Sequence, residues 1–166
     1  IGWELSDFAA SKIGRKVLFV DTLNVFVNDP SVPALLDVVA GKARLDDAVR
    51  TSKTVSGAQV AVVRFFNEGD RHQVLAQIEA LKSQFDALSS RFDLIVLPVS
   101  DIVSDPVAQT ISSMAHSVAL VVEADRTRAP VVKQSLRLIE GSGSRIAGTI
   151  LNKRIFYIPK PFYRFI

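Results

Sequence analysis

The sequence predicts an α/β domain with a doubly wound, mostly parallel sheet, and two observations carry this prediction. Short apolar segments without polar alternation recur along the chain, as is typical of parallel strands that are buried on both faces. Helical segments separate them, and this alternation implies right-handed crossovers within an open sheet. With 166 residues, 48% of them hydrophobic, the chain is long enough to bury one core.

Five segments are expected to form strands, because they are short, apolar and mostly rich in β-branched residues. They are residues 16–20, 59–64, 94–97, 118–122 and 145–151.

Four longer segments are expected to form helices, each for a local reason. Residues 4–13 end at Gly14, and residues 70–89 place six apolar side chains on one face. Residues 105–115 and 129–140 each have a proline near their start, which favours a helix N-terminus. Two shorter helices, at 33–41 and 45–50, interrupt the alternation.

The composition limits the function classes. The chain has no cysteine and two histidines that are far apart, so disulfides, thiolate metal sites and imidazole metal sites are not expected. No apolar run reaches the roughly 18 residues that span a bilayer, and we expect a soluble domain. The net charge of +3 is modest, and no nucleic-acid partner is expected. We place the domain at residues 1–154 and a basic, aromatic tail at residues 155–166.

Ligands of open α/β sheets bind beyond the carboxyl ends of the strands, so the residues that follow each strand are the candidate site. Carboxylates, an amide and cations lie there, a mixture suited to a magnesium nucleotide. These residues are Asp21 to Asn24, Pro98 to Asp101, Glu123 to Arg126, and Asn152 to Arg154.

Five segments, in the same order, resemble the cytoplasmic domain of bacterial tyrosine kinases (BY-kinases) and of polysaccharide chain-length regulators, which are related to the P-loop partitioning ATPases. The segments are "GRKVLFVDTLN", "LLDVVAGKARLDDAV", "RFDLIVLPVSD", "VAQTISSMAHSVALVVEADRTR" and "IAGTILNKR". The resemblance covers nearly the whole chain. It implies a P-loop NTPase-like fold, a nucleotide and magnesium site that includes Asp21, and an adenine contact from Asn152.

The chain departs from this family where the metal should bind. Leu23 stands at the family's second acidic position, Val25 at its arginine, and Pro98 at its magnesium-associated aspartate. Proline offers neither charge nor side-chain oxygen, so a metal ligand is lost. Asp101, three residues further on, is the remaining carboxylate that could replace it.

The phosphate-binding loop is also missing from these 166 residues, since no G-x-x-x-x-G-K-[ST] match occurs in them. The family has a central strand before that loop, and a sheet that lacks a central strand leaves backbone groups unpaired. We therefore expect residues 1–3 to be the end of that strand, with the phosphate loop absent between Trp3 and the helix at residues 4–13. The alternative is that these residues begin after that strand.

Each candidate also has an ordinary structural interpretation. Asp21 could cap a loop, Asn152 could be a turn residue, and Arg126 and Arg128 could be solvated at a helix start. The resemblance makes Tyr157 and Tyr163 candidate phosphorylation sites, because family kinases carry a C-terminal tyrosine cluster. Two tyrosines are few for such a cluster, and the sequence favours unmodified side chains.

The preferred hypothesis is a degenerate BY-kinase-like domain of an exopolysaccharide co-polymerase or export regulator, a pseudokinase with weak or no nucleotide turnover. It would act through self-association or a membrane co-polymerase partner, at the cytoplasmic side of the bacterial inner membrane, with no catalytic residue and no resident metal. One alternative is an active ATP- and magnesium-dependent tyrosine kinase or ATPase whose phosphate loop lies outside these residues. A second is a flavodoxin-like or receiver-like binding module.

Overall fold

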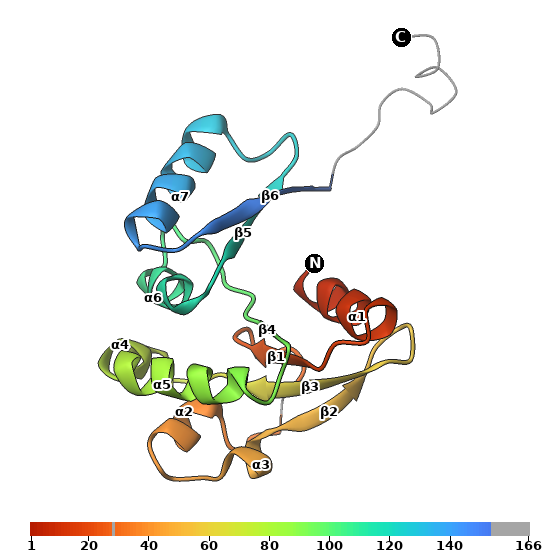
Figure 1. Cartoon of the computed structure of the whole chain (residues 1–166). Coiled ribbons are helices and arrows are strands. Elements are labelled where there is room, and N and C mark those ends of the chain that lie inside the picture. Colours follow the sequence, from red (N-terminus) through yellow and green to blue (C-terminus); the bar gives the residue numbers. More distant parts are fainter. Residues whose placement is uncertain (28, 154–166) are drawn as a thin grey trace. The chain divides into compact units, whose positions relative to one another are not determined.

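The computed structural model describes residues 1–27 and 29–153, which form two compact units with one sheet each (Figure 1). The first unit spans residues 1–100 and the second begins at residue 101. Both units combine parallel strands with helices, so the predicted α/β class with a mostly parallel sheet is confirmed. The predicted domain boundaries stay a prediction, because residues 155–166 lie outside the described residues.

The first unit contains a four-stranded sheet in the order β2-β3-β1-β4. β1 pairs in parallel with β3 and β4, and β2 pairs antiparallel with β3. The elements are α1 (Gly2–Lys12), β1 (Val17–Asp21), α2 (Leu35–Val39), α3 (Leu45–Ala48), β2 (Arg50–Lys53), β3 (Gln59–Arg64), the 3-10 helix η1 (Asp70–His72), α4 (Gln73–Ala76), α5 (Ile78–Ser89) and β4 (Leu94–Val96).

β1 is the centre of this core, since all five of its residues are buried. α1 packs across β1, β3 and β4, with Ala9 against Val17 and Phe19 on one face of the sheet. Side chains alternate along a strand, so Leu18 and Val20 face the other side, where Figure 1 shows α5. The uninterrupted apolar sequence of β1 follows from this two-sided burial.

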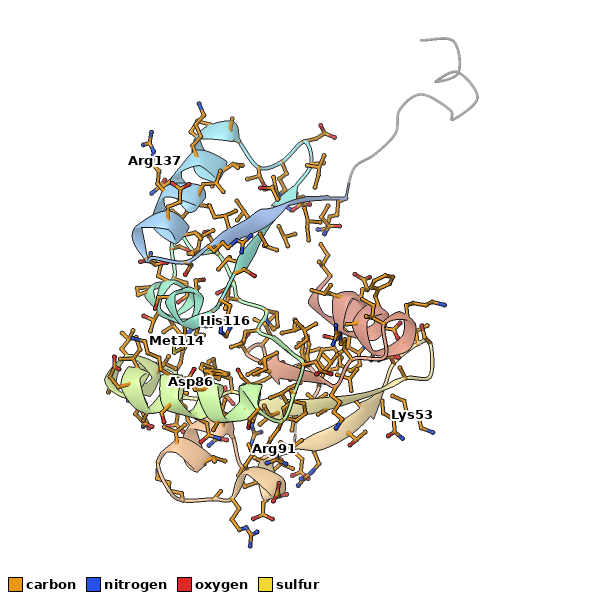
Figure 2. The ribbon with its side chains drawn as sticks, in the orientation of Figure 1. Lys53, Asp86, Arg91, Met114, His116 and Arg137 are labelled. Carbon is orange, nitrogen blue, oxygen red and sulfur yellow. The ribbon has the colours of Figure 1, made fainter. Side chains whose placement is uncertain are left out.

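Charged side chains lie at the edges of the first unit. Arg91, after α5, forms an ion pair of 3.1 Å with Asp46 of α3, and Lys53 ends β2 at the sheet edge (Figure 2). Both partners of the ion pair are more than half exposed, so the contact contributes little to stability.

Three sequence predictions for the first unit need correction. Residues 1–3 are not the end of a strand, because Gly2 and Trp3 form the first turn of α1, which runs on without interruption into Glu4. The predicted helix at 70–89 is divided into η1, α4 and α5, with a break at Gln77 (φ −114°, ψ 19°). β2 was not predicted, since its sequence Arg-Thr-Ser-Lys is polar and three of its four residues are exposed at an edge.

The second unit contains α6 (Pro106–Met114), β5 (Val118–Glu123), α7 (Ala129–Gly141) and β6 (Ile146–Asn152). β5 and β6 pair in parallel, and α7 packs on both strands and on α6. The predicted start of α6 is confirmed: the side chain of Asp105 accepts a 3.0 Å hydrogen bond from the Val107 N–H. Arg137 projects from the outer side of α7 (Figure 2). Among the described residues, the helices are too short or too polar to span a membrane.

Candidate functional site

Asp21, the last residue of β1, is buried with 1% of its surface exposed, and its carboxylate accepts three backbone N–H groups. One carboxylate oxygen accepts the N–H of Leu23 at 3.3 Å. The other accepts the N–H groups of Phe26 at 2.7 Å and Val27 at 3.2 Å. These bonds fold the segment after β1 back onto the strand tip. The carboxylate therefore caps a loop, the ordinary interpretation of the two that the sequence left open.

The tip of β4 lies beside this loop and is bound to it. The Thr22 hydroxyl donates a hydrogen bond to the Pro98 carbonyl oxygen, and Thr22 is buried. A Cβ atom added to Gly2 would lie 3.6 Å from the Pro98 Cβ, so the first turn of α1 reaches the same place. The structure thus brings together Asp21, Pro98 and the start of α1, three sites that the sequence singled out separately.

The start of α1 carries an aromatic and an acidic side chain. The Trp3 ring stacks on Phe26 with centroids 4.4 Å apart and meets Phe19 edge-on at 5.3 Å. Glu4, in the same turn, has a side chain that is 80% exposed. The sequence contained this information as Gly2-Trp3-Glu4, but it was missed because residues 1–3 were expected to end a strand and only Glu4 was expected to belong to the helix.

Arg64 is a buried cation at the same end of the sheet, which sequence reasoning overlooked. It ends β3, opposite Asp21 in the β1–β3 register, and 5% of its surface is exposed. Its guanidinium donates to the carbonyl oxygen of Asp29 at 3.2 Å and to that of Val32. Arg64 therefore anchors residues 29–32 onto the sheet. The sequence signal was a charged residue closing an apolar strand.

Asp101, the carboxylate considered as a replacement ligand, caps its own turn. Its two oxygens accept the Val103 N–H at 3.0 Å and the Ser104 hydroxyl at 2.9 Å. It belongs to the second unit, whereas Asp21 and Pro98 belong to the first.

The strand tips of the second unit hold an ion cluster around Glu123. Glu123 ends β5 opposite Asn152, which ends β6 and whose carbonyl oxygen accepts the Ala124 N–H at 2.8 Å. The Lys153 ammonium lies 3.1 Å from the Glu123 carboxylate, and the Arg126 guanidinium lies 3.6 Å from it. The hydrogen bond from Lys153 and the two positive charges hold the pKa of Glu123 below its usual value.

This cluster accounts for Arg126 as a surface partner of Glu123, and it places Asn152 at the predicted strand tip. The two candidate cofactor residues thus lie in different units, Asp21 in the first and Asn152 in the second. The candidate phosphorylation sites Tyr157 and Tyr163 lie outside the described residues. Across residues 1–27 and 29–153, histidines, aspartates and glutamates form no group of three or more that could hold a metal ion.

Sequence comparisons find no match for this chain, whereas comparison of structures finds proteins with a similar fold. No family model and no curated protein sequence matches the chain. Among solved structures, the kinase domain of Escherichia coli tyrosine kinase ETK is similar with a TM-score of 0.76 and 20% identity, over 96% of this chain and 64% of that one. The VpsO kinase domain has a TM-score of 0.71 and 20% identity, over 93% and 75% of the two chains. The Pyrococcus furiosus cell division ATPase MinD has a TM-score of 0.64 and 22% identity, over 96% and 70%.

These similarities define the fold class: the chain has the P-loop NTPase fold. Within that class, its fold is similar to that of BY-kinase kinase domains and of the cell division ATPase MinD, as the sequence resemblance predicted. The chain spans about two thirds of the length of the ETK kinase domain. Fold similarity at this level of identity leaves function to the chemistry of the site.

Proposed function

We propose that this chain is a BY-kinase-like domain that does not turn over nucleotide and acts by assembly or interaction in polysaccharide export. The observation that carries the proposal is the commitment of the Asp21 carboxylate to three backbone N–H groups. A magnesium ion prefers carboxylate oxygens in near-octahedral geometry. A magnesium ion at Asp21 would compete with these donors for a buried carboxylate, and each donor left unsatisfied would cost about 1–3 kcal/mol.

The neighbouring groups offer no replacement for that carboxylate. Leu23 and Val25 are apolar and more than half exposed, and Pro98 has no side-chain oxygen. The Pro98 carbonyl oxygen already accepts the Thr22 hydroxyl. A divalent ion at this strand tip would therefore meet one occupied carboxylate and neutral groups, which do not offset the charge of a triphosphate.

The first turn of α1 supports the same conclusion from the phosphate side. In a P-loop the lysine and the hydroxyl residue stand where the helix begins, and the helix N-terminus binds the phosphates. We match Gly2-Trp3-Glu4 at the start of α1 to the Gly-Lys-[Ser/Thr] of that motif, which puts Trp3 at the lysine position and Glu4 at the hydroxyl position. An indole cannot neutralise a phosphate, and the Glu4 carboxylate repels one.

The number of catalytic groups without a counterpart bears on whether nucleotide turnover is weak or absent. Phosphoryl transfer depends almost wholly on positioning and on charge neutralisation. Removing a single stabilising donor from an active site commonly lowers kcat by about 10²–10³. This chain lacks the lysine, the hydroxyl ligand and a metal carboxylate together, so we infer that ATP hydrolysis and tyrosine phosphorylation are both absent.

The biological setting follows from the family that the sequence resembles. We place the domain at the cytoplasmic side of the bacterial inner membrane, where it self-associates or binds a membrane polysaccharide co-polymerase. What supports this setting is the order of the five matching segments together with the kinase-domain fold. Sedimentation of the full chain, alone and with a co-polymerase cytoplasmic segment, tests the assembly role. A chain that sediments as a monomer and does not bind the segment would contradict the assembly role.

The decisive experiment is calorimetric titration of the full chain with Mg-ATP and Mg-ADP. The ETK kinase domain, titrated in parallel, is the positive control. We expect no saturable heat from this chain at millimolar nucleotide. Saturable binding of Mg-ATP, together with ATP hydrolysis by the same chain that EDTA abolishes, would reject the proposal and favour the active kinase or ATPase alternative.

A further inference from the structure

Three aromatic rings close the strand end of the first unit. Trp3 stacks on Phe26 at 4.4 Å, and both rings meet Phe19 edge-on, at 5.3 Å and 5.1 Å. They come from α1, the loop after β1, and β1 itself. We call these three residues the ring cluster. Their centroid distances all lie in the range in which aromatic pairs attract each other beyond simple area burial.

Two sets of contacts hold residues 22–27: ring contacts of the ring cluster, and hydrogen bonds to the Asp21 carboxylate. Phe26 takes part in both contacts: its ring stacks on Trp3 and its N–H binds the Asp21 carboxylate at 2.7 Å. Between them the loop turns through Asn24, whose φ of 53° lies in the left-handed region. Thr22 therefore fixes the start of the loop through its hydrogen bond to Pro98. The Asp21 carboxylate binds the loop at residues 23, 26 and 27, and the Trp3 ring packs on Phe26 near its end.

We propose that the ring cluster is a ligand-independent clasp, which keeps residues 22–27 on the first turn of α1 in the absence of nucleotide. The proposal rests on the proposed function, in which no nucleotide orders this loop. A site that binds phosphate orders its loops through charge and metal coordination, which depend on magnesium and on salt. Ring stacking orders the same loop through apolar contact, which depends on neither.

Amide hydrogen exchange of the full chain tests this, because the Phe26 and Val27 N–H groups report on loop opening directly. Replacing Trp3 with alanine removes two of the three ring contacts. We expect protection of both amides to fall about tenfold, since each aromatic pair shifts an equilibrium several-fold. Trp3→Phe keeps a ring and should retain most of the protection. Unchanged protection in Trp3→Ala, with the Val20 and Val63 amides also unchanged, would overturn the proposal.

A matched control and a second variant guard against general destabilisation. Phe8→Ala removes an aromatic side chain from the same helix at a position that is 55% exposed, and it should leave both amides unaffected. Phe26→Ala truncates a ring that is 40% exposed, so it disturbs the core less than Trp3→Ala does. Trp3 is the chain's one tryptophan, and its fluorescence should shift in Phe26→Ala but not in Phe8→Ala. A shift of equal size in both variants would also overturn the proposal.

The same measurement with Mg-ATP separates this proposal from the proposed function. Protection of Phe26 and Val27 in the unmodified chain should not change on adding Mg-ATP. If Mg-ATP raises protection while Trp3→Ala still lowers it in the absence of nucleotide, the clasp stands and the nucleotide-free function fails. If protection in the unmodified chain appears only with Mg-ATP, the clasp fails.

Discussion

Asp21 and Arg64 end neighbouring parallel strands in register, and their side chains bind different parts of the one segment that connects β1 to α2. The Asp21 carboxylate accepts N–H groups from residues 23–27, and the Arg64 guanidinium donates to carbonyl oxygens of residues 29–32. No ion pair joins the two in the part of the chain that the structure describes. Two buried charges at the strand ends therefore fix the segment that follows β1.

Asp21→Asn should lower the free energy of unfolding by about 2 kcal/mol or more, because an amide group would face backbone donors that now share a carboxylate. Urea unfolding followed by circular dichroism measures this change. Asp86→Asn, on the exposed side of α5, is the control and should stay within about 0.5 kcal/mol. If Asp21→Asn is as stable as the unmodified chain, the carboxylate is not a structural cap.

Thr22→Val should lower the free energy of unfolding by about 1 kcal/mol, since the shape is kept while the Pro98 carbonyl oxygen, which is half-buried, loses its donor. Thr22→Ser retains the hydroxyl and should recover most of that loss. The two variants are compared by their urea midpoints. A Thr22→Val variant as stable as the unmodified chain would mean that the hydrogen bond does not stabilise this contact.

Phe65→Ala should cost about 3–5 kcal/mol, because Phe65 is fully buried and stacks on Phe85 with centroids 6.3 Å apart. Phe65→Leu keeps most of the volume and should cost less. Phe8→Ala, at a largely exposed position, serves as the surface reference. Thermal and urea unfolding both measure the order, and a Phe65→Ala variant as stable as Phe8→Ala would contradict the observed core.

Glu123→Gln should change how stability depends on pH. The hydrogen bond and charge of Lys153, with the charge of Arg126, lower the pKa of Glu123 in the folded chain. Its contribution is therefore fully present above its unfolded pKa of roughly 4.3 and is lost as pH falls through the lower folded value. Unmodified chain and variant should differ at pH 7 and converge in acid.

Thermal melting from pH 7 down to pH 3 measures this convergence. Glu140→Gln, an exposed glutamate of α7, is the matched control. A gap between Glu123→Gln and the unmodified chain that stays constant through acid pH would show that protonation of Glu123 is not the cause.

β1 could be predicted, because its uninterrupted apolar sequence matches its burial on both faces. The same kind of sequence predicted β5 and β6 as strands, although several of their residues are exposed. β2 could not be predicted, since it is polar and gains its place only by pairing with β3. The break at Gln77 was missed for a similar reason: Leu75 fits the apolar face of one long helix, yet 49% of its surface is exposed.

The candidate site, too, could be predicted only in part from the sequence. Its position at the strand tips followed from the order of strands and helices, and the missing carboxylate at Pro98 is visible in the sequence itself. The role of Asp21 did not follow, because its donors lie two, five and six residues further on and reach it only when the loop folds back. The role of Trp3 was missed because its ring partners come from β1 and the loop after it.

The sequence by itself determined the fold class and the lack of a side-chain oxygen at Pro98, since local apolar periodicity and side-chain chemistry are properties of the residues alone. Only the tertiary structure decided what Asp21 and Trp3 do at that strand end. Hydrogen bonds and ring contacts act over a few ångströms, and such distances between separate segments are set by the folded chain.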